Sequence, residues 1–187
     1  MSFSVTPSIL SFSYLVATVL FIFPIVFLMP VFVVEIFERE SGGYGLLISM
    51  MGLGGLAGAL AFTALGRWNR GLLLILGSFV SGTALLLMGS VPVYTAAVGF
   101  LLMLGIGDSA RRVVIQSLLV EVADERYRGR VMSAYIMLQG LMPLGILPAG
   151  YAVDRFGAQP TVMILGAGML TTAAVVLLTQ KTLRRIQ

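Results

Sequence analysis

The segment GLLLILGSFVSGTALLLMGSVPVYTAAVGFLLMLGIG, residues 71–107, contains no charged side chain. A helix needs about 20 apolar residues to cross the hydrocarbon core of a bilayer. The segment is too long for one crossing, and Ser90, Val91 and Pro92 interrupt it, so it predicts two membrane-spanning helices joined by a short turn. Further uncharged runs cover residues 1–34, 41–66, 131–153 and 156–180.

The composition of the whole chain agrees with this pattern. Hydrophobic residues make up 58% of the 187 residues, charged residues make up 11%, and the mean hydropathy is +1.01. A soluble domain needs more charge on its surface, so the class is an integral membrane protein. The first apolar run is too long for a signal peptide and is expected to be the first span.

Several functional classes are excluded or disfavoured by what the sequence lacks. It contains no cysteine and no histidine, which excludes disulfides, thiolate metal sites and imidazole chemistry. No phosphate-binding loop, metal-ligand cluster or nucleophile–base pattern is visible in it. We therefore expect no enzyme activity, no cofactor and no metal. The net charge of +4 indicates topology rather than nucleic-acid binding, and no nucleic-acid partner is expected.

The apolar runs and the breaks between them predict an all-α bundle of six transmembrane helices in a single domain over residues 1–187. The helices are expected at residues 8–36, 45–66, 72–89, 93–122, 131–152 and 161–180. Gly54 and Gly58 in the second helix have the small-x-x-x-small spacing that predicts close helix packing. Pro143 and Pro148 make the fifth helix locally breakable.

Basic residues are distributed unequally between the two ends of the expected bundle. With both termini on one side, that side carries Arg67, Arg70, Arg126, Arg128, Arg130, Lys181, Arg184 and Arg185. The opposite side carries Arg39 and Arg155. Because loops rich in Lys and Arg stay in the cytoplasm, both termini are expected to be cytoplasmic. We expect the protein to lie in the plasma (inner) membrane.

Two segments suggest an internal repeat. The segment AGALAFTALGRWNRGLLLILG, 57–77, and the segment AGYAVDRFGAQPTVMILG, 149–166, both contain small and apolar residues, a short turn with Arg and an aromatic residue, and an apolar helix. Three helices separate the two copies, so they point in opposite directions through the membrane. This pattern predicts an inverted three-plus-three repeat, which is typical of many secondary transporters.

The expected fourth helix carries an unusual group of polar residues in the stretch GIGDSARRVVIQ, 105–116. Asp108, Arg112 and Gln116 are spaced at i, i+4 and i+8, and Arg111 is at i+3, so all four lie on one side. Each charge near the centre of a membrane helix costs about 2.5–3.5 kcal/mol unless it is paired or hydrated. Gln139 in the fifth helix is a second candidate for the same interior path.

Two interpretations of this group remain open. In the first, Asp108 holds an arginine or takes part in proton coupling, and Arg111 or Arg112 meets an anionic group of a substrate along a water-accessible path. In the second, an Asp–Arg pair only locks the fourth helix to a neighbour. One helix does not decide which arginine faces inward.

The loop ADERYRGRVMSAY, 123–135, resembles a cytoplasmic loop of major facilitator superfamily transporters, and Arg128, Gly129, Arg130, Val131 and Met132 match its pattern. The likeness is strongest to the branch of enterobactin exporters and macrolide efflux proteins. The segments 45–71 and 150–160 resemble further parts of the same family. The likeness covers the chain but matches helices seven to twelve, the C-terminal half of such a transporter.

This resemblance implies a secondary active antiporter, with proton-coupled efflux of a small amphipathic or anionic compound such as a drug or siderophore. It also implies a cytoplasmic gate or latch made of Arg67, Arg70, Glu125, Arg128 and Arg130. Alternatively, these residues set the topology and contact anionic lipid. Leu65 and Gly66 precede Arg67 where the family usually has an acid, so a latch that depends on that acid is not expected here.

In this family the substrate lies between two six-helix halves, so a lone half forms one wall. The expected partners are therefore the lipid bilayer, a small-molecule substrate and a second bundle. That bundle belongs to a longer chain, to a separate N-terminal half, or to a second copy of this chain. The alternative function is a truncated or non-transporting bundle that acts as a structural or assembly partner.

Overall fold

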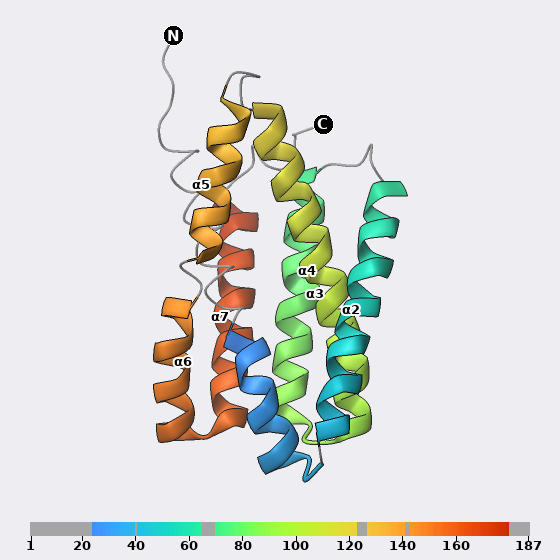
Figure 1. Cartoon of the computed structure of the whole chain (residues 1–187), viewed down its shortest axis with the longest axis vertical. Coiled ribbons are helices and arrows are strands. Elements are labelled where there is room, and N and C mark those ends of the chain that lie inside the picture. Colours follow the sequence, from blue (N-terminus) through green and yellow to red (C-terminus); the bar gives the residue numbers. More distant parts are fainter. Residues whose placement is uncertain (1–23, 40, 65–69, 123–126, 141–142, 180–187) are drawn as a thin grey trace.

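The computed structural model describes residues 24–39, 41–64, 70–122, 127–140 and 143–179, and it contains helices and short connections in these ranges. Residues 24–31 are helical and continue into a π-helix, η1 (Phe32–Ile36). The α-helices that follow are α2 (Ser41–Ala64), α3 (Arg70–Ser90), α4 (Tyr94–Val122), α5 (Arg128–Gly140), α6 (Pro143–Phe156) and α7 (Ala158–Thr179). They run up and down along one axis (Figure 1).

The expectation of an all-helical membrane protein is confirmed over these residues. Helices α2, α3, α4 and α7 overlap the ranges 45–66, 72–89, 93–122 and 161–180 that the apolar runs predict. Residues 8–23 of the expected first helix lie outside the described residues. The number of six spans stays a prediction.

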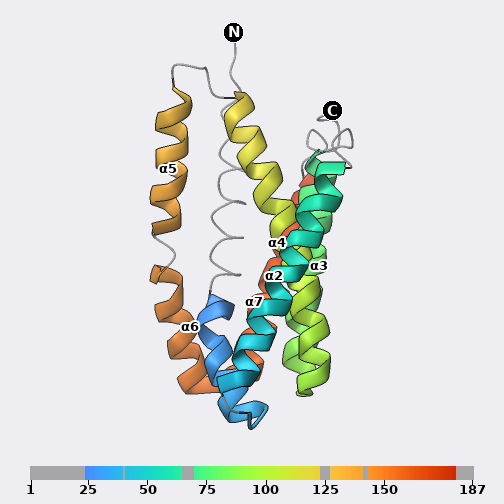
Figure 2. The same cartoon turned by 45° about the vertical axis from the view of Figure 1, so that its right-hand side comes forward.

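The expected fifth helix, 131–152, is described as two helices, α5 and α6, on either side of residues 141–142, which lie outside the described residues. Pro143 is the first residue of α6. Proline has no backbone N–H to donate to the preceding turn, and its fixed φ suits the start of a helix. Helices α5 and α6 lie end to end along one edge of the bundle (Figure 2).

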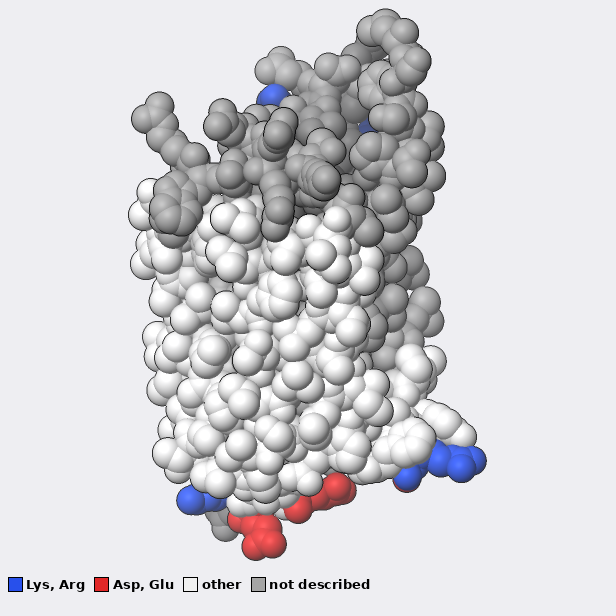
Figure 3. All heavy atoms as spheres, turned by 180° about the vertical axis from the view of Figure 1, so that it is seen from behind, with Lys and Arg blue, Asp and Glu red and all other residues white. Residues whose placement is uncertain are grey.

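Three described helices are long and apolar enough to cross a membrane, over Gly42–Ala64, Leu72–Ser90 and Ala158–Val175. Helix α4 has 29 residues and is about 43 Å long at 1.5 Å per residue, against about 30 Å for the hydrocarbon core. On the face drawn in Figure 3, red and blue charged atoms gather at the lower end, and the described surface above them is uncharged and white over most of the length of the bundle. The chain is an integral membrane protein.

Helix α4 is central to the packing, because it contacts α2 on one side and α3 on another, and α3 in turn packs against α7. The contacts of α6 with α7 and of α5 with α4 involve fewer residues.

The two repeat segments are expected to lie at opposite ends of the bundle. The end of α2 and the start of α3 lie at one end of the bundle, and the turn from α6 to α7 lies at the other (Figure 1). The inverted repeat itself stays a prediction.

The contact between α2 and α4 depends on glycine. A Cβ atom on Gly54 would lie 2.1 Å from the carbonyl oxygen of Leu102, and one on Gly105 would lie 2.1 Å from the carbonyl oxygen of Met51. Such distances are impossible for a real side chain. The two backbones therefore touch, as the small-x-x-x-small pattern that begins at Gly54 predicts.

Helix α3 also approaches α4 and α7 closely at glycine residues. A Cβ atom on Gly107 would lie 2.4 Å from the carbonyl oxygen of Gly77, which brings α4 onto α3. A Cβ atom on Gly166 would lie 3.0 Å from the carbonyl oxygen of Gly82, which brings α7 onto α3. Glycines thus position α4 between α2 and α3 with little room for rotation about its axis.

A hydrophobic core fills the space beside these contacts. It includes Phe32 from η1, Leu47 from α2, Leu85 from α3, Leu101 from α4 and Met169 from α7, all of them buried. The core thus contains side chains from five elements, and α4 contributes Leu101 and Leu104 to it. We call the side of α4 that carries these two residues its inner face.

We predict that Gly105→Ala destabilises the protein by about 1–3 kcal/mol, because the new methyl group forces α2 and α4 apart. Gly52→Ala is the matched control, since a Cβ atom at Gly52 has nothing within 4 Å. The control should be neutral or slightly stabilising. Thermal unfolding of the purified protein in detergent, followed by circular dichroism, measures both effects. Equal midpoints for the two variants would contradict the close contact at Gly105.

Candidate functional site

The carboxylate of Asp108 lies in the middle of α4. It lies fourteen positions after Tyr94 at the start of the helix and fourteen positions before Val122 at its end, about 21 Å in each direction at 1.5 Å per residue. Its side chain is 7% exposed. A carboxylate at this depth cannot reach either aqueous surface, so it needs partners inside the protein.

Both partners come from the next turn of the same helix. Arg111 donates from Nη2 to Oδ1 of Asp108, and Arg112 donates from Nε to Oδ2 over 2.7 Å. The spacings of three and four residues bring these side chains together, as the sequence predicts. These ion pairs lie within α4 and do not tie it to a neighbouring helix. One carboxylate faces two guanidinium groups, so the cluster Asp108–Arg111–Arg112 carries a net charge of +1.

The two arginines differ in burial. The side chain of Arg111 is 5% exposed, whereas that of Arg112 is 47% exposed. Arg111 is thus enclosed by protein together with Asp108. Arg112 binds the same carboxylate from the side of the cluster that the protein leaves partly uncovered.

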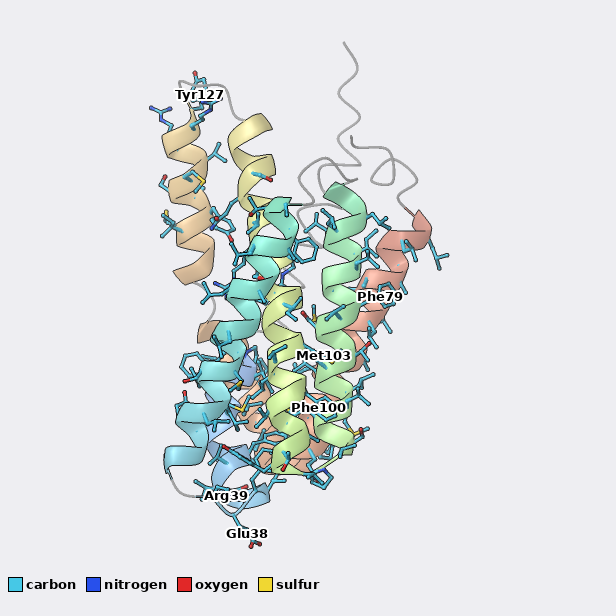
Figure 4. All side chains as sticks on the ribbon, turned by 90° about the vertical axis from the view of Figure 1, so that its right-hand side faces the viewer. Glu38, Arg39, Phe79, Phe100, Met103 and Tyr127 are labelled. Atoms are coloured by element: carbon cyan, nitrogen blue, oxygen red, sulfur yellow. The ribbon has the colours of Figure 1, made fainter. Side chains whose placement is uncertain are left out.

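The cluster continues the inner face of α4. Five of the buried residues of this helix recur at alternating intervals of four and three: Ala97, Leu101, Leu104, Asp108 and Arg111. This spacing defines one stripe along a helix. Phe100 and Met103 lie on α4 in the part of the bundle below the cluster (Figure 4). The first three residues of this stripe, up to Leu104, are apolar, and the last two, Asp108 and Arg111, are charged.

Beyond the cluster, α4 moves away from α2 and α3 and toward α5 (Figures 1 and 2). Gln116, one turn after Arg112, is exposed in this part of the helix. Arg112 and Gln116 are therefore two exposed polar side chains on one face of α4, in the part of the helix that leads to the end of the bundle where α5 begins.

The structure places only some of the other predicted site residues. Arg67 and Glu125 lie outside the described residues. Arg70 begins α3 and Gln139 lies near the end of α5, and the side chains of both are outside the described part. Their roles in a gate or an interior path stay predictions.

Arg128 and Arg130 are exposed in the first turn of α5. The guanidinium carbon of Arg130 lies 5.8 Å from the ring centroid of Tyr127, which Figure 4 labels at the tip of this end. Cations at a helix N-terminus oppose the helix dipole, so these arginines do not serve the stability of α5. Their position suits either contact with lipid head groups or a latch, as the sequence suggests.

The sequence interpretation missed a cluster at the opposite end of the bundle. The guanidinium carbon of Arg39 lies 5.1 Å from the ring centroid of Tyr94, and the hydroxyl of Tyr94 donates to the carbonyl oxygen of Gly43 over 2.9 Å. Phe37 packs edge-on against the same ring. A shallow groove of about 470 Å³ lies here, lined by Glu38, Arg39, Gly42, Gly43, Leu46 and Tyr94. The only sequence signal was an arginine beside a glycine pair.

Among the described residues, no group of three or more acidic side chains is placed to hold a metal ion. The candidate site is therefore the cluster in α4. This cluster is suited to bind anions, because a guanidinium group presents several charged hydrogen-bond donors to a carboxylate or another anion.

The sequence is similar to a family of known proteins and to one of its curated relatives. The family model described as Major Facilitator Superfamily matches residues 2–144. The staphyloferrin A transporter of Staphylococcus aureus is 30% identical over 149 residues, which cover 74% of this chain and 35% of that transporter. The chain thus spans about a third of the length of this curated relative.

We predict that Asp108→Ala lowers the free energy of unfolding by about 3–5 kcal/mol, because it leaves a buried guanidinium without its counter-charge. Arg112→Ala should cost about 1 kcal/mol or less, since Asp108 and Arg111 remain as a neutral pair and Arg112 is half exposed. Unfolding in detergent, followed by circular dichroism, compares the two variants. A larger loss for Arg112→Ala would contradict this division of roles.

Proposed function

The chain belongs to the major facilitator superfamily, and from this membership we propose that it acts as the C-terminal six-helix half of a secondary active transporter. The proposed activity is proton-coupled efflux of a small amphipathic or anionic compound, such as a drug or a siderophore. The protein is expected to work in the plasma (inner) membrane with both termini in the cytoplasm.

The observation that carries this proposal is the charged cluster on the inner face of α4. A buried ionic group in a membrane helix is costly, and such groups commonly mark substrate or ion pathways. Here the group lies at the midpoint of the longest described helix, and exposed Gln116 continues its polar face in the direction of the bundle end that we expect to be cytoplasmic. A membrane anchor with no transport role has no need of this arrangement.

The sign of the cluster supports an anionic substrate. Its net charge of +1 attracts anions, and the named relative is a transporter of staphyloferrin A. Proton coupling is assigned to Asp108, which is the buried acidic side chain among the described residues. Gln116, exposed one turn away, adds an amide that can donate to the same ligand.

In this proposal a second helical bundle forms the other wall of the transport path. The chain covers 35% of the length of the named relative, so the missing wall is expected in a longer chain, in a separate N-terminal half or in a second copy. The edge formed by α5 and α6 exposes large apolar side chains, including Met137 and Leu147 at 74% and 72%. These side chains suit either lipid or such a bundle.

We predict that cells that express this chain with a matching N-terminal half export fluorescent or antibiotic substrates, and that Asp108→Asn or Arg112→Ala abolishes the export. The physical reason is that both variants change the charge of the interior path. The measurement is the rate of efflux from preloaded cells, with Arg155→Ala as the control that leaves the interior unchanged. No export in any pairing, with the protein inserted and folded, would instead favour the non-transporting structural partner.

We predict that a cysteine introduced at Gly42 reacts with a membrane-impermeant maleimide on intact cells, and that one at Gly129 reacts only after permeabilisation. Both positions are exposed and leave open space for a side chain, and the chain contains no other cysteine. The positive-inside rule places Gly129 beside the arginines of the cytoplasmic end. Labelling in the opposite order would reverse the proposed topology.

A further inference from the structure

We propose that Arg112 is the residue that binds an anionic ligand, and that a ligand carboxylate takes the place of Asp108 on its guanidinium while Arg111 keeps Asp108 in position. This proposal deepens the transport function above and rests on it for its physiological meaning. In this proposal Arg112 binds the ligand and Arg111 holds Asp108. The carboxylate of Asp108 occupies the ligand-binding position on Arg112 when no ligand is bound.

The first support is the charge of the cluster. Asp108 carries one negative charge and binds two guanidinium groups, each of which carries one positive charge. In surroundings of low dielectric constant, opposite charges attract more strongly than in water, so the guanidinium groups of the cluster attract anions. The site therefore favours a ligand that presents a carboxylate to the cluster.

The second support is the way in which Asp108 divides its oxygen atoms. Oδ1 accepts from Arg111 and Oδ2 accepts from Arg112, so the bond to Arg112 can break while the buried bond remains. Arg112 uses its Nε for Asp108, and in the described part of the chain no hydrogen bond occupies its two Nη groups. A guanidinium fork with free donors matches a carboxylate in a bidentate way.

The third support is access. The side chain of Arg112 is 47% exposed, and the exposed Gln116 lies four residues further along the same face. A ligand that approaches along this face meets the amide of Gln116 and then the guanidinium of Arg112. It meets Asp108 and Arg111 only after Arg112, because both of these side chains are buried.

Comparison with other exposed arginines sets Arg112 apart. The guanidinium carbons of Arg39, Arg130 and Arg155 each lie between 5.1 and 5.8 Å from the ring centroid of a tyrosine near the bundle ends. Within the described residues, Arg112 has no such aromatic partner, and its bond is to a carboxylate in the middle of a helix. A ligand carboxylate can replace another carboxylate there with little rearrangement.

The experiment measures binding of 5-carboxyfluorescein to the full chain in nanodiscs of phosphatidylcholine, by fluorescence anisotropy. We expect benzoate to compete with the probe and the cationic dye rhodamine 6G not to compete. Arg112→Ala should raise the Kd at least about tenfold, because a charge-assisted hydrogen bond contributes about 1.5–3 kcal/mol. Arg155→Ala, which removes an exposed arginine at the far end of α6, is the control and should leave the Kd unchanged.

A second variant tests the role of Asp108. If Asp108 competes with the ligand for Arg112, Asp108→Asn should lower the Kd several-fold, whereas a purely structural pair predicts no gain. Arg112→Lys keeps the charge but loses the fork, so its Kd should fall between those of wild type and Arg112→Ala. These two variants are compared only as folded protein, judged by circular dichroism, and Arg112→Ala decides the question if Asp108→Asn does not fold.

The outcomes separate this proposal from the transport function. Binding that depends on Arg112, without efflux in any pairing, would support the anion site and overturn transport. Efflux together with a Kd that Arg112→Ala leaves unchanged would overturn the anion site and leave transport standing. No binding of 5-carboxyfluorescein by wild type, or no competition by benzoate, would also overturn it.

Discussion

The bond from one carboxylate, Asp108, to two guanidinium groups is the interaction on which the rest of this structure depends. Without it, one carboxylate and two guanidinium groups would lie near the centre of α4 without these ion pairs, and each charge at such a depth costs about 2.5–3.5 kcal/mol. With it, the helix keeps a single net charge on its inner face. Because both partners lie on the next turn of α4, the cluster stays intact when α4 moves relative to its neighbours.

Glycine packing decides where this cluster faces. Gly105 brings α4 onto α2, and Gly107 brings it onto α3, so two flanks of the helix are occupied by backbone. The remaining inner face carries Leu101 and Leu104 in the core and then Asp108. Rotation of α4 about its axis would separate these contacts and turn the charges toward α2 or α3. The glycines and the charged residues of α4 thus specify the same orientation.

Much of this arrangement can be predicted from the sequence, because it depends on local spacing. Apolar runs predict the helices, and intervals of three and four predict that Arg111 and Arg112 meet Asp108. The unequal burial of the two arginines could not be predicted, since it depends on which helices cover each side of α4. The packing of Arg39 on Tyr94 was missed for the same reason, because it joins residues far apart in the chain. The functional role of Gln139 and of the arginines at the cytoplasmic end stays a prediction.

The central claim is that Asp108 is shared between a buried arginine and an accessible one. A double-mutant cycle tests it most directly, with Asp108→Asn, Arg111→Gln and Arg112→Gln made singly and in pairs, and unfolding measured in detergent. The account predicts a coupling free energy of at least about 1 kcal/mol between Asp108 and Arg111, and a smaller one between Asp108 and Arg112. Additive effects for both pairs would contradict it, because they would show that the carboxylate stabilises neither arginine.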